Sequence, residues 1–266
     1  MAVRMFAGID VGASATKCMI ISEKKDELGW AVAKTGIDLA GDARKVFADA
    51  LSKVDVGDEV VSRVVSTGFG RKNVPFADSS KTEISCQSKG CYFYFPKAIV
   101  IVDIGGQDTK VIRTDAGGKL AGFKMNRKCA AGTGTFLEEI SHRLDVSLEE
   151  MNSLATRSTK DVEIGAFCTV FTGTEILARI REGVSKEDLA RGVYKSVVKR
   201  AMEMDTLVGD VVLTGGVVAH NPILRDMFGE ILGREVHSPP NSQLTGAFGA
   251  ALYALQESDQ PDIGHS

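Results

Sequence analysis

The sequence lacks any run of 18 apolar residues, so it offers no segment long enough to cross a bilayer as a helix. Residues 1–12 are apolar only briefly and lack the small-residue cleavage site of a secretory leader. An excess of basic residues is also missing, because the formal net charge is −3. This charge argues against nucleic acid as a partner. We therefore expect a cytoplasmic protein that binds neither membranes nor nucleic acids.

Proline and cysteine are scarce, with 6 prolines and 5 cysteines among 266 residues. An odd number of cysteines in a cytoplasmic chain argues against a disulfide framework and favours free, catalytic or metal-bound thiols. Glycine, in contrast, is abundant at 28 residues. Many glycines and few prolines are typical of α/β proteins, in which the backbone approaches a ligand closely. The length suffices for two compact domains.

The chain contains two copies of one short pattern, about 93 residues apart. Residues 8–12 read GIDVG and residues 102–106 read VDIGG, and a Thr-Lys pair follows each, at 16–17 and 109–110. In both copies an apolar strand ends in aspartate, a glycine-rich turn reverses the chain, and the Thr-Lys pair opens the next strand. Repetition at the spacing of one domain predicts a duplicated α/β unit.

Each of these turns is suited to a polyphosphate. A hairpin of small residues presents several backbone N–H groups to an anion. Asp10 and Asp103, at the strand ends, can act in catalysis and hold hydrated Mg²⁺ through water. Lys17 would lie near the phosphates, and Gln107 or Asp108 could orient an attacking water. The other residues expected to bind the nucleotide are Gly12, Ser14, Thr16, Gly105, Gly106, Gly132, Gly134, Gly215 and Gly216.

A third segment, residues 213–221, reads LTGGVVAHN and places a double glycine between a strand and a helix. A backbone of two glycines can pass under an adenosine. Taken alone, the Thr-Gly-Gly sequence is equally consistent with an ordinary tight turn. Because this segment follows the two hairpins, the three motifs occur along the chain in the order first phosphate motif, second phosphate motif, adenosine motif. The common P-loop pattern is absent, and residues 132–137 lack the last glycine of a dinucleotide fingerprint.

The cysteines fall into two groups. Small residues lead from Cys129 into a predicted helix, and Cys168 stands just before another. The positive end of a helix dipole favours a thiolate or an anionic cluster, although either thiol could instead be a small apolar filler. Two thiolates per chain are too few for a four-cysteine cluster, whereas a symmetric dimer would supply four. Cys18 is expected in the core, and Cys86 and Cys91 could be metal ligands, a redox pair or packing residues.

Over nearly its whole length the chain resembles the activators of 2-hydroxyacyl-CoA dehydratases and the ATP-binding subunits of benzoyl-CoA reductases. The resemblance rests on GIDVGASATKC, VSTGFGR, VDIGGQDTKV, MNRKCAAGTGTFLE, CTVFTGTE, LTGGVVAHN and LTGAFGAALYA. It implies an α/β fold of the duplicated actin/hexokinase/Hsp70-like (ribonuclease H-like) type with two ATPase domains. We expect the first domain at 1–97 plus 246–258, the second at 98–245, and a tail at 259–266.

The resemblance also implies an activity and its cofactors. Two copies, or one copy and a related subunit, would share one [4Fe–4S] cluster held by Cys129 and Cys168 of each chain. Binding and hydrolysis of ATP to ADP with Mg²⁺ would inject a low-potential electron, taken from ferredoxin or flavodoxin, into a dehydratase or reductase catalytic component. Residues 171–175 read FTGTE where the dehydratase activators are expected to read FAESE, and His220 precedes Asn221. These departures leave the partner open and slightly favour a reductase subunit or a divergent paralogue.

Two rival interpretations share the nucleotide motifs. A small-molecule kinase of the same fold would use them with a catalytic aspartate, and a non-enzymatic nucleotide-sensing or assembly protein would use them without one. Both leave Cys129 and Cys168 without a role.

Apolar periodicity predicts strands at 4–10, 16–22, 60–66, 98–103, 109–114 and 211–214, and helices at 41–53, 133–144, 147–156, 173–182, 186–208, 222–233 and 246–257. The glycine-rich segments 132–134 and 246–249 are hypothetical hinges.

Overall fold

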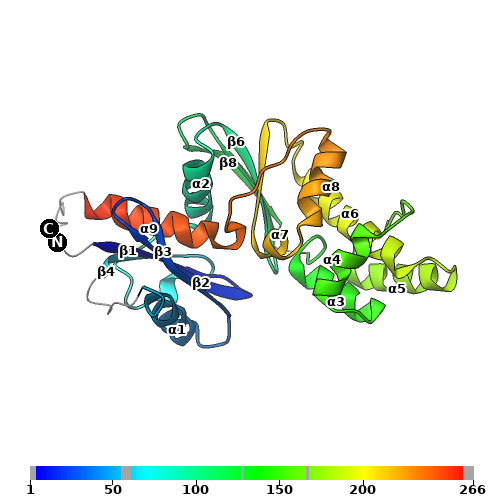
Figure 1. Cartoon of the computed structure of the whole chain (residues 1–266), viewed down its shortest axis with the longest axis horizontal. Helices are drawn as coiled ribbons and strands as arrows, with labels where there is room; N and C mark the ends of the chain where they lie inside the picture. Colours follow the sequence, from blue (N-terminus) through cyan, green and yellow to red (C-terminus); the bar gives the residue numbers. More distant parts are fainter. Residues whose placement is uncertain (1–3, 55–60, 127–128, 166–167, 260–266) are drawn as a thin grey trace. The chain divides into compact units, whose positions relative to one another are not determined.

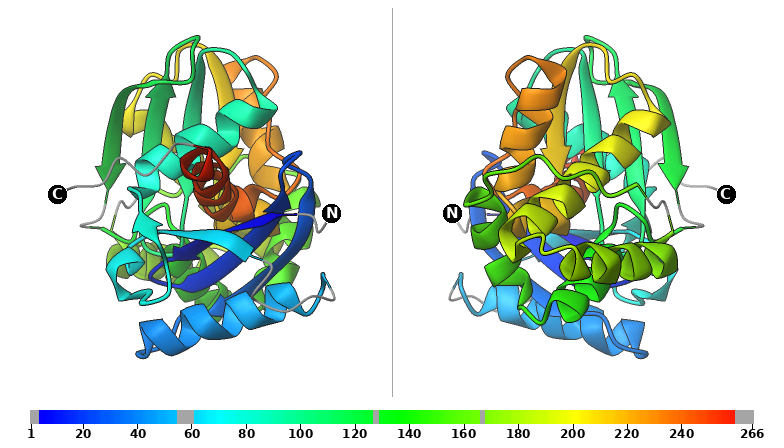
Figure 2. Two further views of the ribbon diagram at one scale, coloured as in Figure 1. Left: turned by 90° about the vertical axis from the view of Figure 1, so that its left-hand side faces the viewer. Right: turned by 90° about the vertical axis from the view of Figure 1, so that its right-hand side faces the viewer.

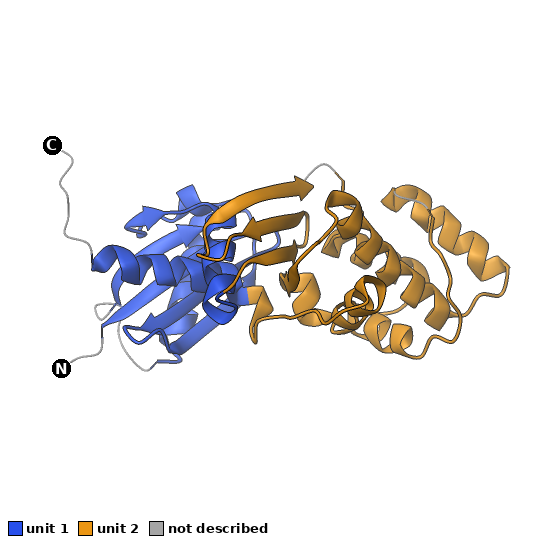
Figure 3. Ribbon diagram, turned by 90° about the horizontal axis from the view of Figure 1, so that it is seen from above, with its two compact units in different colours: residues 1–96, 244–266 blue, residues 97–243 orange. Residues whose placement is uncertain are grey.

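The computed structural model describes residues 4–54, 61–126, 129–165 and 168–259. Contacts divide the chain into two compact units, Met1–Pro96 with Leu244–Ser266, and Lys97–Gln243 (Figure 3). We call them unit 1 and unit 2. Within the described ranges, no helix is both long and apolar enough to cross a membrane.

Unit 1 is built on a five-stranded sheet in the order β3-β2-β1-β4-β5 (Figure 1). Strands β1, β2 and β3 are antiparallel neighbours, whereas β4 is parallel to β1 and β5 to β4. The strands are β1 Met5–Val11, β2 Ala15–Ser22, β3 Glu27–Lys34, β4 Val61–Thr67 and β5 Ser79–Ser80. The helices are α1 Leu39–Leu51, the short 3₁₀ helix η2 Arg71–Asn73, α2 Glu83–Tyr94 and α9 Thr245–Ser258.

Helices cover both faces of this sheet, with α1 on one side and α9 on the other (Figure 2, left). Side chains alternate along a strand, so Ile9 of β1 packs in the core beneath α1 while Phe6 packs with Phe248 of α9. The side chain of Asp10 is on the same face as Phe6. The carboxylate that ends β1 therefore lies on the α9 side of the sheet, where a Cβ placed on Gly246 would be 3.2 Å from Asp10 Oδ2.

Helices α2 and α9 cross at glycines. A Cβ added at Gly249 would lie 1.8 Å from the carbonyl oxygen of Cys86, and one added at Gly90 would lie 2.3 Å from that of Thr245. Only glycine allows the two backbones to approach this closely, so the crossing fixes where α2 lies relative to the start of α9.

Unit 2 is built on a four-stranded sheet in the order β8-β7-β6-β9, in which β7 is antiparallel to both neighbours and β9 is parallel to β6. Helices α3 to α6 pack together at one end of the unit (Figure 2, right). The strands are β6 Ile99–Ile104, β7 Thr109–Thr114, β8 Leu120–Asn126 and β9 Asp210–Thr214. The helices are α3 Gly134–Leu144, α4 Leu148–Thr156, α5 Thr169–Arg181, α6 Lys186–Met204, α7 Gly216–His220, α8 Ile223–Leu232 and the 3₁₀ helix η3 Ser242–Leu244.

The strand order confirms the predicted duplication. The order β3-β2-β1-β4 in unit 1 is repeated as β8-β7-β6-β9 in unit 2, with the same strand directions. Asp10 lies opposite Lys17 on one neighbouring strand and Thr67 on the other. In the same way, Asp103 lies opposite Lys110 and Thr214.

Several elements differ from the sequence prediction. Strands β3 and β8 and helix α2 were not predicted. Helix α5 begins at Thr169 rather than 173. Helix α6 ends at Met204 rather than 208, because Asp205 adopts an extended backbone with φ of −156°. Of the predicted tail 259–266, residues 260–266 lie outside the described residues.

Candidate functional site

The first glycine-rich turn joins β1 to β2 and is held by its own hydrogen bonds. The N–H of Gly12 donates to the carbonyl of Ala15 at 3.1 Å, and Thr35 Oγ1 donates to the carbonyl of Gly12 at 2.8 Å. Thr16 is fully buried, and its hydroxyl is 2.8 Å from that of Thr35. Ser14, in contrast, is exposed at the tip of the turn. Thr35 was not recognised from the sequence, because it lies far from the motif that it supports.

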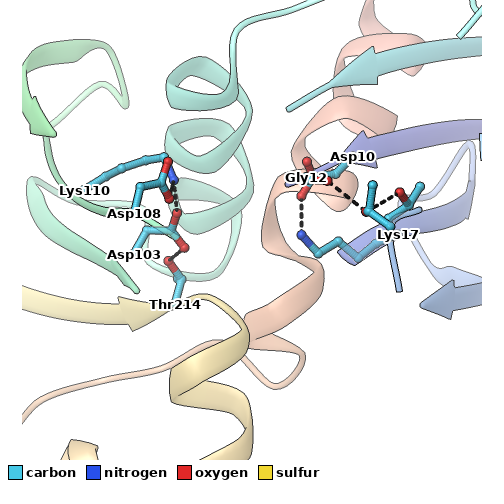
Figure 4. Close-up of polar contacts among 9 residues, drawn as sticks. Asp10, Gly12, Lys17, Asp103, Asp108, Lys110 and Thr214 are labelled. Atoms are coloured by element: carbon cyan, nitrogen blue, oxygen red, sulfur yellow. Dashed lines mark hydrogen bonds and ion pairs between the residues drawn. The ribbon is translucent and has the colours of Figure 1, made fainter. Parts of the chain in front are cut away.

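Each hairpin pairs the aspartate at its strand end with a lysine, as Figure 4 shows. Lys17 Nζ is 3.0 Å from Asp10 Oδ2, and Lys110 Nζ is 3.1 Å from Asp103 Oδ2. Lys110 also donates to Asp108 Oδ1 at 2.6 Å. The Asp108 carboxylate thus has a charged partner within its own hairpin, whereas Gln107 beside it is exposed.

The two aspartates differ in the hydrogen bonding of Oδ1, the carboxylate oxygen that does not pair with the lysine of its hairpin. Asp103 Oδ1 accepts a hydrogen bond from Thr214 Oγ1 at 3.2 Å, so both of its oxygens have partners (Figure 4). Asp10 Oδ1 is buried and has no hydrogen-bond partner among the described residues, although Thr67 occupies the position that corresponds to Thr214. The duplicated sites are therefore equivalent in backbone but not in side-chain hydrogen bonding.

A glycine follows each of these threonines, and both are in the left-handed region. Gly68 has φ of 88° and Gly215 has φ of 98°. A Cβ would lie 2.4 Å from Asp10 Oδ1 at Gly68 and 2.8 Å from Asp103 Oδ1 at Gly215, so both glycines let the backbone pass beside the carboxylate. The second Thr-Gly pair was recognised from the sequence, but the first was not identified as its counterpart.

The second glycine-rich turn, which joins β6 to β7, is hydrogen-bonded to the start of helix α3. The N–H of Gly134 donates to the carbonyl of Gly105 at 3.0 Å, and the N–H of Thr135 donates to that of Gly106 at 2.9 Å. A Cβ at Gly134 would lie 3.0 Å from the Cα of Gly106. These hydrogen bonds connect the segment that follows Cys129 to the second glycine-rich turn.

The third motif leads from β9 into α7. Gly215 lies between them, and its N–H donates to the carbonyl of Ser242 at 3.0 Å, while Gly216 begins α7. Asn221 at the end of α7 is buried, and its Oδ1 accepts a hydrogen bond of 2.5 Å from the hydroxyl of Tyr194 on α6. Asn221 thus anchors the motif, a role that its position after His220 did not reveal.

Burial separates the five cysteines. Cys18, Cys86 and Cys91 are fully buried, and burial raises the pKa of Cys86 to about 12 and that of Cys18 further still. Cys129 and Cys168 are only partly buried. The two thiols that were predicted to bind iron are therefore the two that reach the surface of this chain.

Of the two partly buried cysteines, Cys168 stands at the start of a helix and Cys129 in the loop that leads to one. Cys168 is the N-terminal capping residue of α5, and its side chain makes no capping hydrogen bond to the helix. Val170 and Phe171 beside it are 70% and 69% exposed. Cys129 lies five residues before α3, where its carbonyl accepts a hydrogen bond of 3.3 Å from Asn126 Nδ2. Residues 127–128 and 166–167, which precede the two cysteines, lie outside the described residues.

One chain cannot hold a four-ligand iron–sulfur cluster with the side chains that are described. Within those ranges, no three cysteine, histidine, aspartate or glutamate side chains come together as a metal-binding group. A [4Fe–4S] cluster takes four thiolates, and this chain offers two that are partly buried, so a second copy or a related subunit would have to supply the other two.

Known proteins place the chain in a family. Residues 7–254 match the BadF/BadG/BcrA/BcrD ATPase family. The activator of lactoyl-CoA dehydratase from Anaerotignum propionicum is 41% identical over 94% of this chain and 96% of its own length. A benzoyl-CoA reductase subunit from Thauera aromatica is 27% identical over 92% of this chain and 92% of its own length.

Solved structures of two activators superpose on the whole chain. Component A of the (R)-2-hydroxyglutaryl-CoA dehydratase of Acidaminococcus fermentans matches with a TM-score of 0.91 at 36% identity. The match covers 97% of this chain and 100% of component A. The activator of the 2-hydroxyisocaproyl-CoA dehydratase of Clostridium difficile, with bound ADPNP, matches with a TM-score of 0.89 at 34% identity, covering 98% and 99%.

The expected actin/hexokinase/Hsp70-like fold is confirmed by these neighbours and by the repeated strand order. Together with the match over residues 7–254, they show that the chain belongs to the BadF/BadG/BcrA/BcrD ATPase family.

Proposed function

We propose that this protein is an ATP-dependent activator that delivers a low-potential electron to the catalytic component of a 2-hydroxyacyl-CoA dehydratase or a benzoyl-CoA reductase. The observation that carries the proposal is the combination of two glycine-rich Asp-Lys hairpins with two partly buried cysteines, one capping α5 and one in the loop that leads to α3. The higher identity to a dehydratase activator, 41% against 27% for the reductase subunit, favours a dehydratase as the partner.

The hairpins would bind the phosphates of ATP or ADP. The backbone of Gly12, Ser14, Thr16, Gly105 and Gly106 would face the phosphates, with Lys17 as a point charge. Gly132 and Gly134 would shape the loop beside them, and Gly215 and Gly216 would pass under the adenosine. Carboxylate oxygens suit Mg²⁺, which keeps several of its waters, so Asp10 and Asp103 would hold it through water. Gln107, exposed at the second turn, is the proposed water-orienting side chain there.

Cys129 and Cys168 of two chains would hold one [4Fe–4S] cluster. When bound, the cluster would supply one-electron chemistry at low potential. The residues of this chain would orient it: the N-terminal turn of α5, which Cys168 caps without a side-chain hydrogen bond, favours a negative charge beside that thiolate. Exposed Val170 and Phe171 offer apolar area next to Cys168 that a second subunit would cover. Ferredoxin or flavodoxin would serve as the electron donor.

Anaerobic reconstitution of activity tests this function. The protein, a reduced ferredoxin or flavodoxin and a dehydratase catalytic component should together dehydrate a 2-hydroxyacyl-CoA only when Mg²⁺ and ATP are present. A non-hydrolysable ATP analogue should give no turnover. The same mixture with a benzoyl-CoA reductase component provides the comparison. ATP hydrolysis without activation of either component would contradict the proposed electron transfer and favour a kinase.

A further inference from the structure

The chain that leads from α4 to Cys168 has no regular secondary structure over residues 158–165, all of which are described. We call these residues the connecting segment. Because the connecting segment belongs to neither a helix nor a sheet, its N–H groups bond to side chains of neighbouring elements or to water. Two carboxylates act as acceptors for it, one near each end, and they come from different helices of unit 2.

Asp188, in the first turn of α6, holds the beginning of the connecting segment. Its Oδ1 accepts hydrogen bonds from the N–H groups of Thr159 at 3.0 Å and Lys160 at 2.9 Å. The hydroxyl of Ser158 donates to the same oxygen at 2.9 Å. The other oxygen, Oδ2, accepts from the hydroxyl of Ser185 at 2.7 Å. Asp188 is only 4% exposed, so these bonds attach the connecting segment firmly to the start of α6.

The middle of the connecting segment lies directly against α6. A Cβ added at Gly192 would be 2.7 Å from the carbonyl oxygen of Val162, so glycine is what lets the two backbones approach this closely. The same helix supports the loop after Cys129, because a Cβ added at Gly132 would be 2.9 Å from the Cβ of Arg200. Both segments that carry the partly buried cysteines therefore pack on α6.

Glu175, on α5, holds the end of the connecting segment. Both of its carboxylate oxygens are 3.1 Å from the backbone nitrogen of Gly165, which donates its N–H to them. A carboxylate acceptor makes such a bond stronger than a neutral one. Glu175 lies about two helical turns beyond Cys168. The bond thus closes a loop that starts at Gly165, passes through Cys168 and returns to the chain on α5.

The backbone of Cys168 is held on its other side by α5 itself. Its carbonyl accepts hydrogen bonds from the N–H of Thr172 at 2.8 Å and from the hydroxyl of Thr172 at 3.0 Å. These bonds fix the chain after the cysteine, whereas the bond from Gly165 to Glu175 restrains the chain before it.

We propose that Glu175 is a positioning residue for Cys168. By holding the N–H of Gly165, it fixes the direction in which the chain enters α5 and so keeps the thiol in place. This inference rests on the proposed function, in which that thiol binds iron together with the thiol of Cys129. Glu175 acts through the backbone, and its role was not identified from the sequence.

The test compares two substitutions of Glu175 with a control on the same helix. Glu175→Ala removes the acceptor, and Glu175→Gln keeps an acceptor oxygen but removes the charge. Glu182→Ala is the control, because Glu182 is an exposed residue at the C-terminal end of α5 whose carboxylate pairs with Arg179 at 3.2 Å. The control therefore removes an equal charge from α5 at the end far from the connecting segment.

Two measurements report on the position of Cys168. In the iron-free protein, amide hydrogen exchange of residues 158–165, followed by mass spectrometry, should be about 10-fold faster in Glu175→Ala, because a hydrogen bond to a charged group is lost. In the iron-loaded protein, release of iron to a ferrous chelator should be faster by a similar factor. Both rates should stay within about 3-fold of the wild type in Glu175→Gln, which can still accept from Gly165. Glu182→Ala should match the wild type in both.

Wild-type rates of exchange and iron release in Glu175→Ala would overturn the proposal. So would a Glu175→Gln variant as defective as Glu175→Ala, or an equal defect in Glu182→Ala, since either would trace the effect to charge rather than to the bond with Gly165. A wild type that binds no iron would instead overturn the proposed function. Hydrogen exchange in the iron-free protein would then still decide whether Glu175 holds the entry to α5.

Discussion

Cys86 illustrates how burial decides the chemistry of a thiol in this chain. It lies on α2 against Thr67, and burial raises its pKa to about 12, so almost none of it is thiolate at neutral pH. Its spacing from Cys91 had allowed a metal or redox pair. The structure places both side chains inside the core of unit 1, on a helix that crosses α9.

This difference in burial predicts selective alkylation. In the protein without iron, iodoacetamide should modify two thiols per chain, Cys129 and Cys168, and all five only after denaturation. The variants Cys129→Ser and Cys168→Ser should each lose one modified site, as read by mass spectrometry. Modification of Cys86 at a rate similar to that of Cys129 would contradict the assignment.

A second residue-scale prediction concerns Asp205, which caps the C-terminal end of α6. Hydrogen bonding to Arg113 lowers the pKa of Asp205 to about 2, with further help from the N–H of Leu207 at 2.9 Å and from Lys124. A depressed carboxyl pKa stabilises the folded state above the unfolded value of 3.8. This stabilisation is lost as the pH falls from there toward about 2.

Urea unfolding between pH 6 and pH 2 measures this effect. Asp205→Asn should be less stable than the wild type at pH 6, and the gap should narrow as the pH falls through the window from 3.8 to about 2. Asp49→Asn, on the exposed side of α1, is the control and should leave the wild-type profile nearly unchanged. A gap that stays constant with pH would show that Asp205 does not contribute through its charge.

Among the elements, the crossing of α2 and α9 depends most directly on glycine. Gly249 stood within a hypothetical hinge, yet it lies inside α9, where its hydrogen faces the backbone of α2. A methyl group there would be 1.8 Å from the carbonyl oxygen of Cys86, a contact that only a shift of a whole helix can relieve.

Gly249→Ala should therefore destabilise the protein by about 2 kcal/mol or more, within or above the usual range for overpacking. Gly122→Ala provides the matched control, since a Cβ there meets no atom within 4 Å, and its free energy of unfolding should change little. Thermal and urea unfolding of both variants measure the effect, and equal stability of the two would refute the role of the crossing.

The elements that could not be found from the sequence have physical reasons in common. Strand β8 is exposed along most of its length at the edge of its sheet, and β3 is half exposed at the edge of the other, so neither has a strong apolar alternation. Helix α2 contains Gly90 and ends in aromatic residues, which weakens its local helical signal. Packing against α9 overrides that propensity, and packing between distant segments cannot be read from a local window.

The candidate site could be predicted where it is local in sequence. Both Asp-Lys pairs follow from hairpins in which the two residues are opposite each other, seven positions apart. Thr35 could not be found in this way, because it reaches Thr16 and the carbonyl of Gly12 from beyond the end of β3. The difference in hydrogen bonding between Asp10 and Asp103 likewise depends on the direction of one threonine side chain.

At the scale of the whole molecule, the duplication gives two units with the same strand order and different side chains around it. Unit 1 carries the open carboxylate of Asp10, whereas unit 2 carries Cys129 and Cys168 and the proposed adenosine motif. The loop after Cys129 leads to α3, whose first N–H groups donate hydrogen bonds to the carbonyls of the second glycine-rich turn. Within unit 2, a nucleotide at the second glycine-rich turn would therefore have a short covalent and hydrogen-bonded route to Cys129.

The central claim is that four thiols, two from each of two chains, hold one iron–sulfur cluster. Anaerobic purification followed by iron and sulfide analysis, with the molar mass measured by light scattering, tests it most directly. We predict about four irons and four sulfides per dimer for the wild type, and loss of both in Cys129→Ser and in Cys168→Ser, while Cys91→Ser retains them. Iron-free wild-type protein, or iron retained by the Cys129→Ser and Cys168→Ser variants, would contradict the account.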